Sequence, residues 1–267
     1  LSSAASDVYK RQYEKLYLDS YPLSFSSTGA AYPQARKRML DRINDGVAYV
    51  NYIGHANPRE WGHEKLLTWT DIENLSNRRL PFIYAATCEF LRWDDDDISG
   101  GEKLWLKPES GVIGMICPSR KVYISLNGDL NTNTSRHMFA TAPDGGSMRI
   151  GDVMTAGKND TPRDDNKLRY ALMGDPALRL PAPVLRIRPD TVAGIATDRA
   201  DTLPVLKARQ KTLISGSVTD RDGNIAEDFN GTLELQLFDA ETVVETYGNG
   251  ETGKATVYNC LLYTSPS

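Results

Sequence analysis

The chain has 267 residues, a formal net charge of -4, 25% charged residues and 40% hydrophobic residues. This composition is typical of a globular protein with one sizeable core and a smaller one, and it argues against a fully disordered chain. No apolar run is long enough to cross a membrane as a helix, and the mild acidity disfavours nucleic acid as a partner because phosphate binding requires a basic face.

The two ends of the chain read like translated sequencing adapters. Residues 2–12 read SSAASDVYKRQ and residues 260–267 read CLLYTSPS. Tails of this kind do not belong to the fold. The alternative is that both segments are ordinary polar termini. We therefore predict non-native tails at 1–12 and 260–267. The natural segment would be a fragment cut at both ends, without a signal peptide.

Alternating helical and strand-like stretches fill the region from about 33 to 181. The expected helices cover 34–43, 70–77, 99–107, 130–140 and 149–157, and the expected strands cover 47–54, 80–88 and 111–117, with 178–180 closing the domain. Thr70 and Glu73 have the spacing of a capping box. Strands that alternate with helices predict an α/β domain, at 13–183, whose mostly parallel sheet is covered on both faces. The continuous apolar run at 111–117 indicates a strand buried on both faces.

The texture of the sequence changes after Pro181-Ala182-Pro183. Short β-rich runs occur at 184–187, 211–219, 232–238 and 242–247. Residues 220–224, which read DRDGN, are a turn signal between two of these runs. Such runs predict a partial immunoglobulin-like β-sandwich over 184–259.

Two of the expected strands end at residues that suit nucleophilic catalysis. One runs to His55 and the other to Cys88, 33 residues later (88 − 55 = 33). Catalytic groups of open α/β sheets lie at the carboxyl ends of strands, and one strand–loop–helix–strand unit fits this gap. Adjacent parallel strands would then place a histidine beside a cysteine, which attacks a carbonyl only as thiolate. The alternative is a packed cysteine and an unrelated surface histidine.

Metal binding is a second possible chemistry. Zinc is disfavoured because no short C-x-x-C or H-x-x-x-H spacing occurs among the five candidate ligands, His55, His63, Cys88, Cys117 and His137. Oxygen ligands on loops suit calcium better, at Asp94 and Asp96 or at Asp129, although solvated loops explain these residues more simply. A Cys88–Cys117 disulfide is not expected.

Several motifs in combination resemble the gingipain-type cysteine peptidases of family C25. They are VNYIGH at 50–55, WG at 61–62, LPFI at 80–83, ATCEF at 86–90 and LMGDPAL at 172–178. KLYLDSYP at 15–22 and YP at 32–33 favour the PorU branch, the sortase of the type IX secretion system, and EKLLT at 64–68 is a further match. The likeness covers most of 13–183 and, more loosely, the β-rich region that follows.

The resemblance implies a caspase-like α/β fold, followed by an immunoglobulin-like domain, with Cys88 as nucleophile and His55 as base. It also implies an oxyanion hole made by the backbone N–H groups of Cys88 and Ala56. The family usually has glycine where this chain has Ala56, and the added methyl group would restrict the turn. A carboxylate that orients the histidine is expected upstream of residue 13, with Glu60 and Glu89 as substitutes within the chain.

The implied activity is that of an endopeptidase or sortase that removes the C-terminal secretion domain of type IX cargo through an acyl-enzyme. Water, or an amine of a lipopolysaccharide-type acceptor, would resolve that intermediate, and no cofactor is required. The implied partners are secreted cargo proteins and outer-membrane secretion-system subunits, at the cell surface of a Gram-negative bacterium or secreted from it. Trp61, Arg92 and Trp93 follow the two strand ends and are expected either to line a substrate pocket or to pack between loops.

Two other functions fit the same residues. The first is a catalytically impaired peptidase-like scaffold of the secretion apparatus, which is favoured because this chain has Ala56 where the family usually has glycine. An intracellular caspase-like enzyme is disfavoured by the β-rich region after residue 183.

Overall fold

The computed structural model describes residues 14–27, 29–162, 165–181, 185–198, 206, 210–220, 222–231, 242–247 and 252–257. The chain divides into two compact units, one of residues 16–182 with 243–257, the other of residues 183–242 with both chain ends. The tails predicted at 1–12 and 260–267 lie outside the described residues. None of the helices in the described ranges is both long and apolar enough to cross a membrane.

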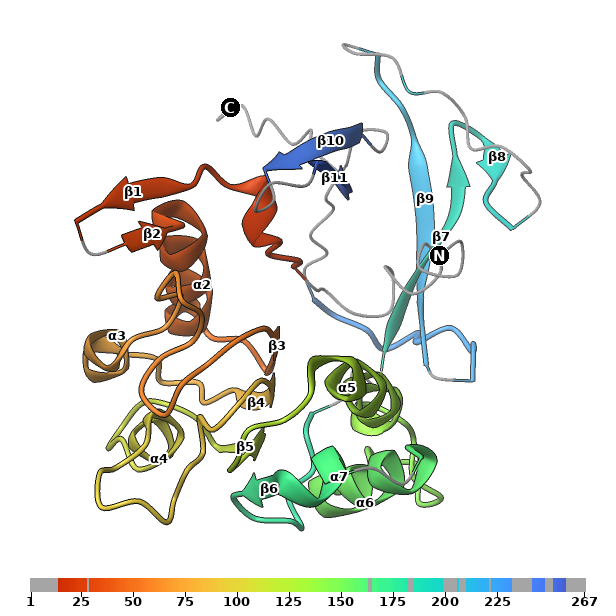
Figure 1. The fold of residues 1–267 in the computed structure, drawn as a ribbon. Coiled ribbons are helices and arrows are strands. Elements are labelled where there is room, and N and C mark those ends of the chain that lie inside the picture. The colour runs from red at the N-terminus through yellow and green to blue at the C-terminus, as the bar shows by residue number, and fades with distance from the viewer. Residues whose placement is uncertain are drawn as a thin grey trace. The chain divides into compact units, whose positions relative to one another are not determined.

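The larger unit contains a four-stranded sheet with helices between its strands (Figure 1). In chain order its elements are η1 (Leu18–Ser20), β1 (Ser24–Ser26), β2 (Gly29–Ala31), α2 (Pro33–Asp45), β3 (Tyr49–Ile53), α3 (Trp69–Asn74), β4 (Phe82–Ala86), α4 (Gly100–Trp105), β5 (Gly114–Pro118), α5 (Ile124–Met138), α6 (Ile150–Asp160), α7 (Asp165–Arg169) and β6 (Tyr170–Met173). The strand order is β3-β4-β5-β6. The first three strands are parallel, and β6 is antiparallel to β5. The predicted mostly parallel sheet is confirmed.

Helices cover both faces of this sheet, because the side chains of its strands alternate between two cores. Ile83 and Ala85 of β4 pack with α2, α3 and α4, whereas Phe82, Tyr84 and Ala86 pack with α5 and α6. Figure 1 shows α2, α3 and α4 on one side of the sheet and α5, α6 and α7 on the other. All five residues of β4 and of β5 are buried, as the continuous apolar runs predict.

Two details of this unit differ from the sequence-based prediction. The capping box of α3 is formed by Thr68 and Asp71, not by Thr70 and Glu73. Asp71 also accepts a hydrogen bond from Arg36 of α2 at 2.7 Å, so a tertiary contact favours the earlier start. The segment 178–180, expected to close the domain, contains only an isolated bridge at Arg179, and the fourth strand of the sheet is β6.

The smaller unit contains an antiparallel three-stranded sheet. Its strands are β7 (Arg186–Val192), β8 (Ile195–Ala196) and β9 (Ile214–Thr219), in the order β8-β7-β9. The predicted turn at 220–224 is confirmed, because the Asp220 carboxylate accepts the N–H groups of Asp222 and Asn224, each at 2.9 Å.

Two further strands, β10 (Thr242–Tyr247) and β11 (Thr252–Val257), pair with each other. The β-rich run at 232–238 lies outside the described residues. The immunoglobulin-like sandwich over 184–259 therefore stays a prediction.

Candidate active site

His55 and Cys88 follow two adjacent parallel strands at the same edge of the sheet. β3 and β4 pair with an offset of 33 residues, since Ile53 lies opposite Ala86 (86 − 53 = 33). His55 and Cys88 have the same offset, so each lies two residues beyond the last paired position of its strand. The Gly54 N–H donates to the Ala86 carbonyl at 3.2 Å and extends the ladder one step toward the pair.

The Cys88 thiol is partly exposed and free of any disulfide. Its Sγ lies 3.6 Å from the carbonyl oxygen of Val122, in the loop between β5 and α5. Within the described part of the chain, no hydrogen bond joins Cys88 to His55. The next residue, Glu89, has a φ of 45°, a left-handed conformation that is uncommon outside glycine and asparagine. The chain therefore turns sharply immediately after the sulfur.

A chain of buried amides holds the segment that faces the sulfur. Asn166 binds the backbone of Tyr123 twice, accepting from its N–H at 2.9 Å and donating to its carbonyl at 2.7 Å. Asn166 also donates to Asn127 at 3.0 Å, and Asn127 donates to the Thr87 carbonyl at 3.4 Å. These bonds connect Thr87, the residue before Cys88, and the segment that faces the Cys88 sulfur to α5 and α7. The sequence motifs gave no signal for Asn166 or Asn127.

The second cysteine of the domain is chemically different from the first. Cys117 of β5 is fully buried, and burial raises the pKa of its thiol well above the ordinary value of 9.0. It therefore stays protonated and inaccessible at neutral pH. Both cysteines are free, as expected from the sequence.

The side chain of His55 is exposed, and its backbone carbonyl is bound from two sides. The imidazole ring lies 5.4 Å from the His63 ring, centroid to centroid. The His55 carbonyl accepts hydrogen bonds from the Tyr52 hydroxyl and from the Gly62 N–H, each at 2.7 Å. The loop that carries His55 is thereby fixed near its start, two residues after the end of β3.

Neither carboxylate proposed as a substitute orients the imidazole. The Glu60 carboxylate accepts from the Asn57 amide at 3.4 Å, and the Glu89 carboxylate lies 3.9 Å from Arg92. Among the described residues, neither makes a hydrogen bond to His55. The carboxylate expected upstream of residue 13 lies outside the described residues.

The two backbone N–H groups expected in the oxyanion hole make no hydrogen bond to another described residue. Ala56 and Trp61 form an antiparallel bridge whose hydrogen bonds are made by the flanking residues, from Asn57 to Glu60 and from Gly62 to His55. As far as the described residues extend, neither the Ala56 N–H nor the Cys88 N–H donates a hydrogen bond. Ala56 does not adopt the positive φ that would require glycine, so its methyl group does not strain this turn.

The three side chains expected to contact substrate or pack between loops have different positions. Trp61 is fully buried and stacks on Tyr52 with ring centroids 4.3 Å apart, so it belongs to the core and cannot line a cleft. Trp93 is 57% exposed, and Arg92 pairs with Asp95 at 3.1 Å. Trp93 and Arg92 remain predicted substrate contacts.

The predicted metal ligands are dispersed. No group of three or more His, Cys, Asp or Glu side chains that could hold a metal ion occurs among the described residues. The Arg120 guanidinium binds Asp94 through two hydrogen bonds and lowers the pKa of that carboxyl group. Asp129 lies on α5, and His137 is paired with Asp160 at 2.6 Å. Calcium at Asp94, Asp96 or Asp129 stays a prediction.

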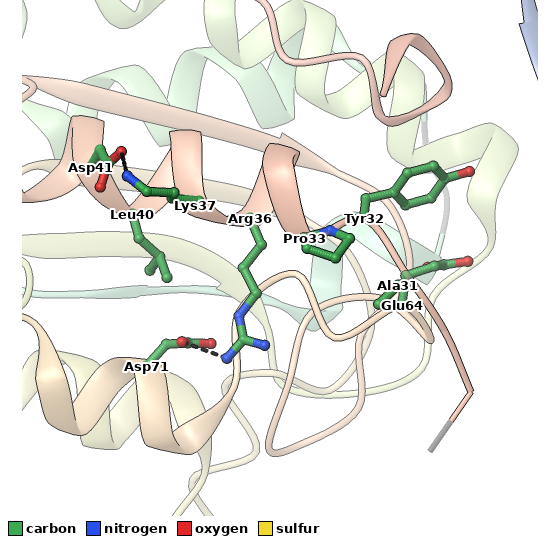
Figure 2. Close-up of a pocket in the computed structure, with 9 residues that line it drawn as sticks. All are labelled: Ala31, Tyr32, Pro33, Arg36, Lys37, Leu40, Asp41, Glu64 and Asp71. Carbon is green, nitrogen blue, oxygen red and sulfur yellow. Dashed lines mark hydrogen bonds and ion pairs between the residues drawn. The ribbon is translucent and has the colours of Figure 1, made fainter. Parts of the chain in front are cut away.

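An open depression of about 380 Å³ lies beside α2 (Figure 2). The basic side chains that line it form ion pairs with acidic side chains that also line it, Arg36 with Asp71 at 2.7 Å and Lys37 with Asp41 at 2.6 Å. Neither His55 nor Cys88 lines it, so this depression is separate from the candidate active site.

A cysteine and a histidine at the carboxyl edge of a helix-covered, mostly parallel sheet form the arrangement that is expected for the class of α/β cysteine-peptidase domains. Residues 2–181, more than half of the chain, match the family model of peptidase family C25, and the chain belongs to that family. The match begins within the predicted 1–12 tail, whose non-native origin stays a prediction.

Individual relatives match smaller parts of the chain. Gingipain R2 of Porphyromonas gingivalis is 38% identical over 53 residues, which are 20% of this chain and 7% of that protein. The crystal structure of the Arg-specific cysteine proteinase gingipain R is 21% identical, with a TM-score of 0.50 over 58% of this chain and 39% of that one. This likeness confirms the caspase-like gingipain fold.

A structure of dimeric latent PorU from Porphyromonas gingivalis is also similar in sequence. It is 26% identical over 89% of this chain and 20% of that chain, with a TM-score of 0.29. A score that low supports no comparison of folds. The chain spans well under two thirds of each of these relatives.

Proposed function

We propose that this chain carries the catalytic core of a cysteine endopeptidase in which Cys88 is the nucleophile and His55 its base. The observation that carries the proposal is the shared edge, since both residues lie two positions beyond the paired ends of adjacent parallel strands. Membership of peptidase family C25 supports the same class of reaction.

The proposed reaction is acyl transfer from a peptide bond. His55 accepts the thiol proton, and the Cys88 sulfur attacks the scissile carbonyl carbon. The carbonyl oxygen takes up the negative charge and accepts hydrogen bonds from the N–H groups of Cys88 and Ala56. When the C–N bond breaks, the His55 imidazolium gives its proton to the leaving amine, and the acyl group stays on sulfur as a thioester.

The proposed substrates are secreted cargo proteins that lose a C-terminal secretion domain, as the PorU-like motifs at 15–22 and 32–33 suggest. Hydrolysis of the thioester by water completes proteolysis, whereas attack by an amine of a lipopolysaccharide-type acceptor completes a sortase reaction. The proposed location is the cell surface or the outer membrane, with secretion-system subunits as partners. No cofactor takes part, because side chains supply both the nucleophile and the base.

Thiol alkylation tests the Cys–His pair directly. In a chain whose Cys117 and Cys260 are replaced by alanine, the rate of iodoacetamide labelling of Cys88 is measured between pH 5 and pH 9. An isolated thiol is almost entirely protonated at pH 6, so we expect His55→Ala to slow labelling there by about ten-fold or more. His63→Ala is the matched control, because its ring lies beside His55 but has no assigned role. Equal rates for all three proteins would contradict the assignment.

Substrate processing tests the reaction itself. Cys88→Ala should abolish cleavage of a cargo protein that carries a C-terminal secretion domain, while its circular dichroism stays that of the unmodified chain. If this variant cleaved the cargo normally, Cys88 would not be the nucleophile.

A second candidate function is a non-catalytic scaffold. It is favoured by the resting contact of the Cys88 thiol, which is with the Val122 carbonyl at 3.6 Å and not with His55. The alkylation experiment separates the two functions, because a scaffold predicts slow labelling at pH 6 with or without His55.

A further inference from the structure

The carbonyl group of His55 is anchored by two hydrogen bonds of 2.7 Å, one from the Tyr52 hydroxyl and one from the Gly62 N–H. We propose that Tyr52 is a positioning residue that aims the Ala56 N–H at the oxyanion. This inference rests on the proposed function, since it assigns a role within the same oxyanion hole.

The argument depends on the planarity of one peptide unit. The His55 carbonyl and the Ala56 N–H belong to the same peptide bond, so in its trans form they point in opposite directions within one plane. Donors that fix the carbonyl on one side therefore fix the direction of the N–H on the other. Two donors restrict rotation of this plane more than one donor does.

The Tyr52 side chain is itself held rigidly. Its ring stacks in parallel on the fully buried Trp61, and Trp61 in turn contacts Phe90, two residues after Cys88. A buried aromatic series thus connects the loop that carries His55 to the loop that carries Cys88. The phenol oxygen cannot move far without disturbing this stack.

Gly54 leaves the space through which the hydroxyl reaches the carbonyl. A Cβ atom at Gly54 would lie 2.6 Å from the Tyr52 hydroxyl oxygen and 2.9 Å from its ring carbon. Real Cβ atoms do not approach other atoms so closely, so any larger residue at this position displaces the phenol. Glycine before the histidine is therefore required by the tyrosine two residues earlier.

An oxyanion hole works because its donors are oriented before charge develops. Loss of a donor lowers kcat by about 10² to 10³-fold, whereas Tyr52→Phe leaves the Ala56 N–H in place but less well aimed. We therefore expect Tyr52→Phe to lower kcat by about ten-fold and to change KM by less than about two-fold. Affinity for a peptide aldehyde, whose oxyanion occupies the hole, should fall by about the same ten-fold.

The control is Tyr84→Phe, the same change at a fully buried tyrosine of β4 that packs in the core on the opposite face of the sheet. It should leave kcat and aldehyde affinity unchanged. Labelling of Cys88 by iodoacetamide at pH 6 should also be unchanged in Tyr52→Phe, because alkylation makes no oxyanion. A general loss of structure would instead alter labelling, KM and kcat together.

Gly54→Ala is a second variant that displaces the hydroxyl from the other side, and it should lower kcat and aldehyde affinity in the same way. If the unmodified chain cleaves substrate while Tyr52→Phe, or Gly54→Ala where Tyr52→Phe does not fold, keeps full kcat and aldehyde affinity, the positioning role is overturned. Failure of the proposed function looks different, because the unmodified chain would then neither cleave nor bind the aldehyde.

Discussion

The thiol of Cys88 faces the carbonyl of Val122 at 3.6 Å, across the gap between the end of β4 and the loop after β5. Val122 shares its peptide bond with the Tyr123 N–H, which donates to the buried Asn166 amide at 2.9 Å. Asn166 thus holds one side of a planar unit whose other side contacts the sulfur. The resting position of the nucleophile depends on a residue 78 positions later in the chain (166 − 88 = 78).

Replacement of Asn166 by leucine should destabilise the protein and release this loop. The change keeps the side-chain volume but leaves the Tyr123 N–H and the buried Asn127 side-chain oxygen without these partners, which costs about 3 kcal/mol. The Tyr123 carbonyl keeps the hydrogen bond from the Asn127 N–H at 3.1 Å. Urea unfolding measures the free-energy loss, and iodoacetamide labelling of Cys88 should accelerate as the Val122 carbonyl moves away. A variant of unchanged stability would show that these hydrogen bonds are replaced by water.

Much of the fold follows from the sequence because its strands are encoded by uninterrupted apolar runs. Residues 82–86 and 114–118 have no polar face, so only a sheet covered on both sides can bury them. β6 escaped prediction because it is short, has only one fully buried residue, and follows directly on α7. Its pairing is decided by contact with β5, which no local pattern records.

The candidate site was predictable in part. Cys88 and His55 end apolar runs, and their 33-residue separation equals the strand offset that the structure has. The supporting groups were not predictable, since Tyr52 reads as an ordinary strand residue and Asn166 as a polar helix residue. The positive φ of Glu89 was hidden for a related reason, because residue type favours glycine or asparagine in that conformation.

The start of α3 can be tested with two threonines only two positions apart. Thr68→Ala removes the side chain that accepts from the Asp71 N–H, and it should lower the free energy of unfolding by about 1 kcal/mol. Thr70→Ala, within the first turn, should change it by less than about 0.5 kcal/mol. Urea denaturation of both variants measures the difference. The opposite ranking would restore the capping box first expected at Thr70.

Stability should fall as the pH rises above about 9. Burial raises the pKa of Cys117 above its ordinary 9.0, so the folded state retains a proton that the unfolded state releases. The stabilising effect is complete below pH 9 and is lost above it, at up to about 1.4 kcal/mol per pH unit for this one group. Burial also raises the pKa of Tyr49, Tyr52 and Tyr84 above their ordinary 10.0, which steepens the decline at higher pH.

The variant that checks this contribution is Cys117→Ala, which should move the onset of the decline from about pH 9 toward pH 10, the ordinary pKa of tyrosine. Urea midpoints at half-unit intervals between pH 7.5 and pH 10.5 record the onset. Cys88→Ala serves as the control and should keep the onset near pH 9. If the decline in Cys117→Ala still began near pH 9, the Cys117 thiolate would have to be solvated in the folded protein.

Close packing of α5 against α6 makes Gly157 intolerant of a side chain. A Cβ atom there would lie 2.6 Å from the Cα atom of Thr134, a backbone contact that no rotamer change relieves. Alanine gains about 1 kcal/mol of helix propensity over glycine, but overpacking costs about 1–3 kcal/mol and here forces the helices apart, so we expect a net loss of up to about 2 kcal/mol. Gly128→Ala on α5 meets nothing within 4 Å and should instead stabilise the protein by up to about 1 kcal/mol. In thermal unfolding, the melting temperature should therefore fall for Gly157→Ala and rise for Gly128→Ala. A rise for both variants would show that helix propensity, not interhelix distance, decides the outcome at Gly157.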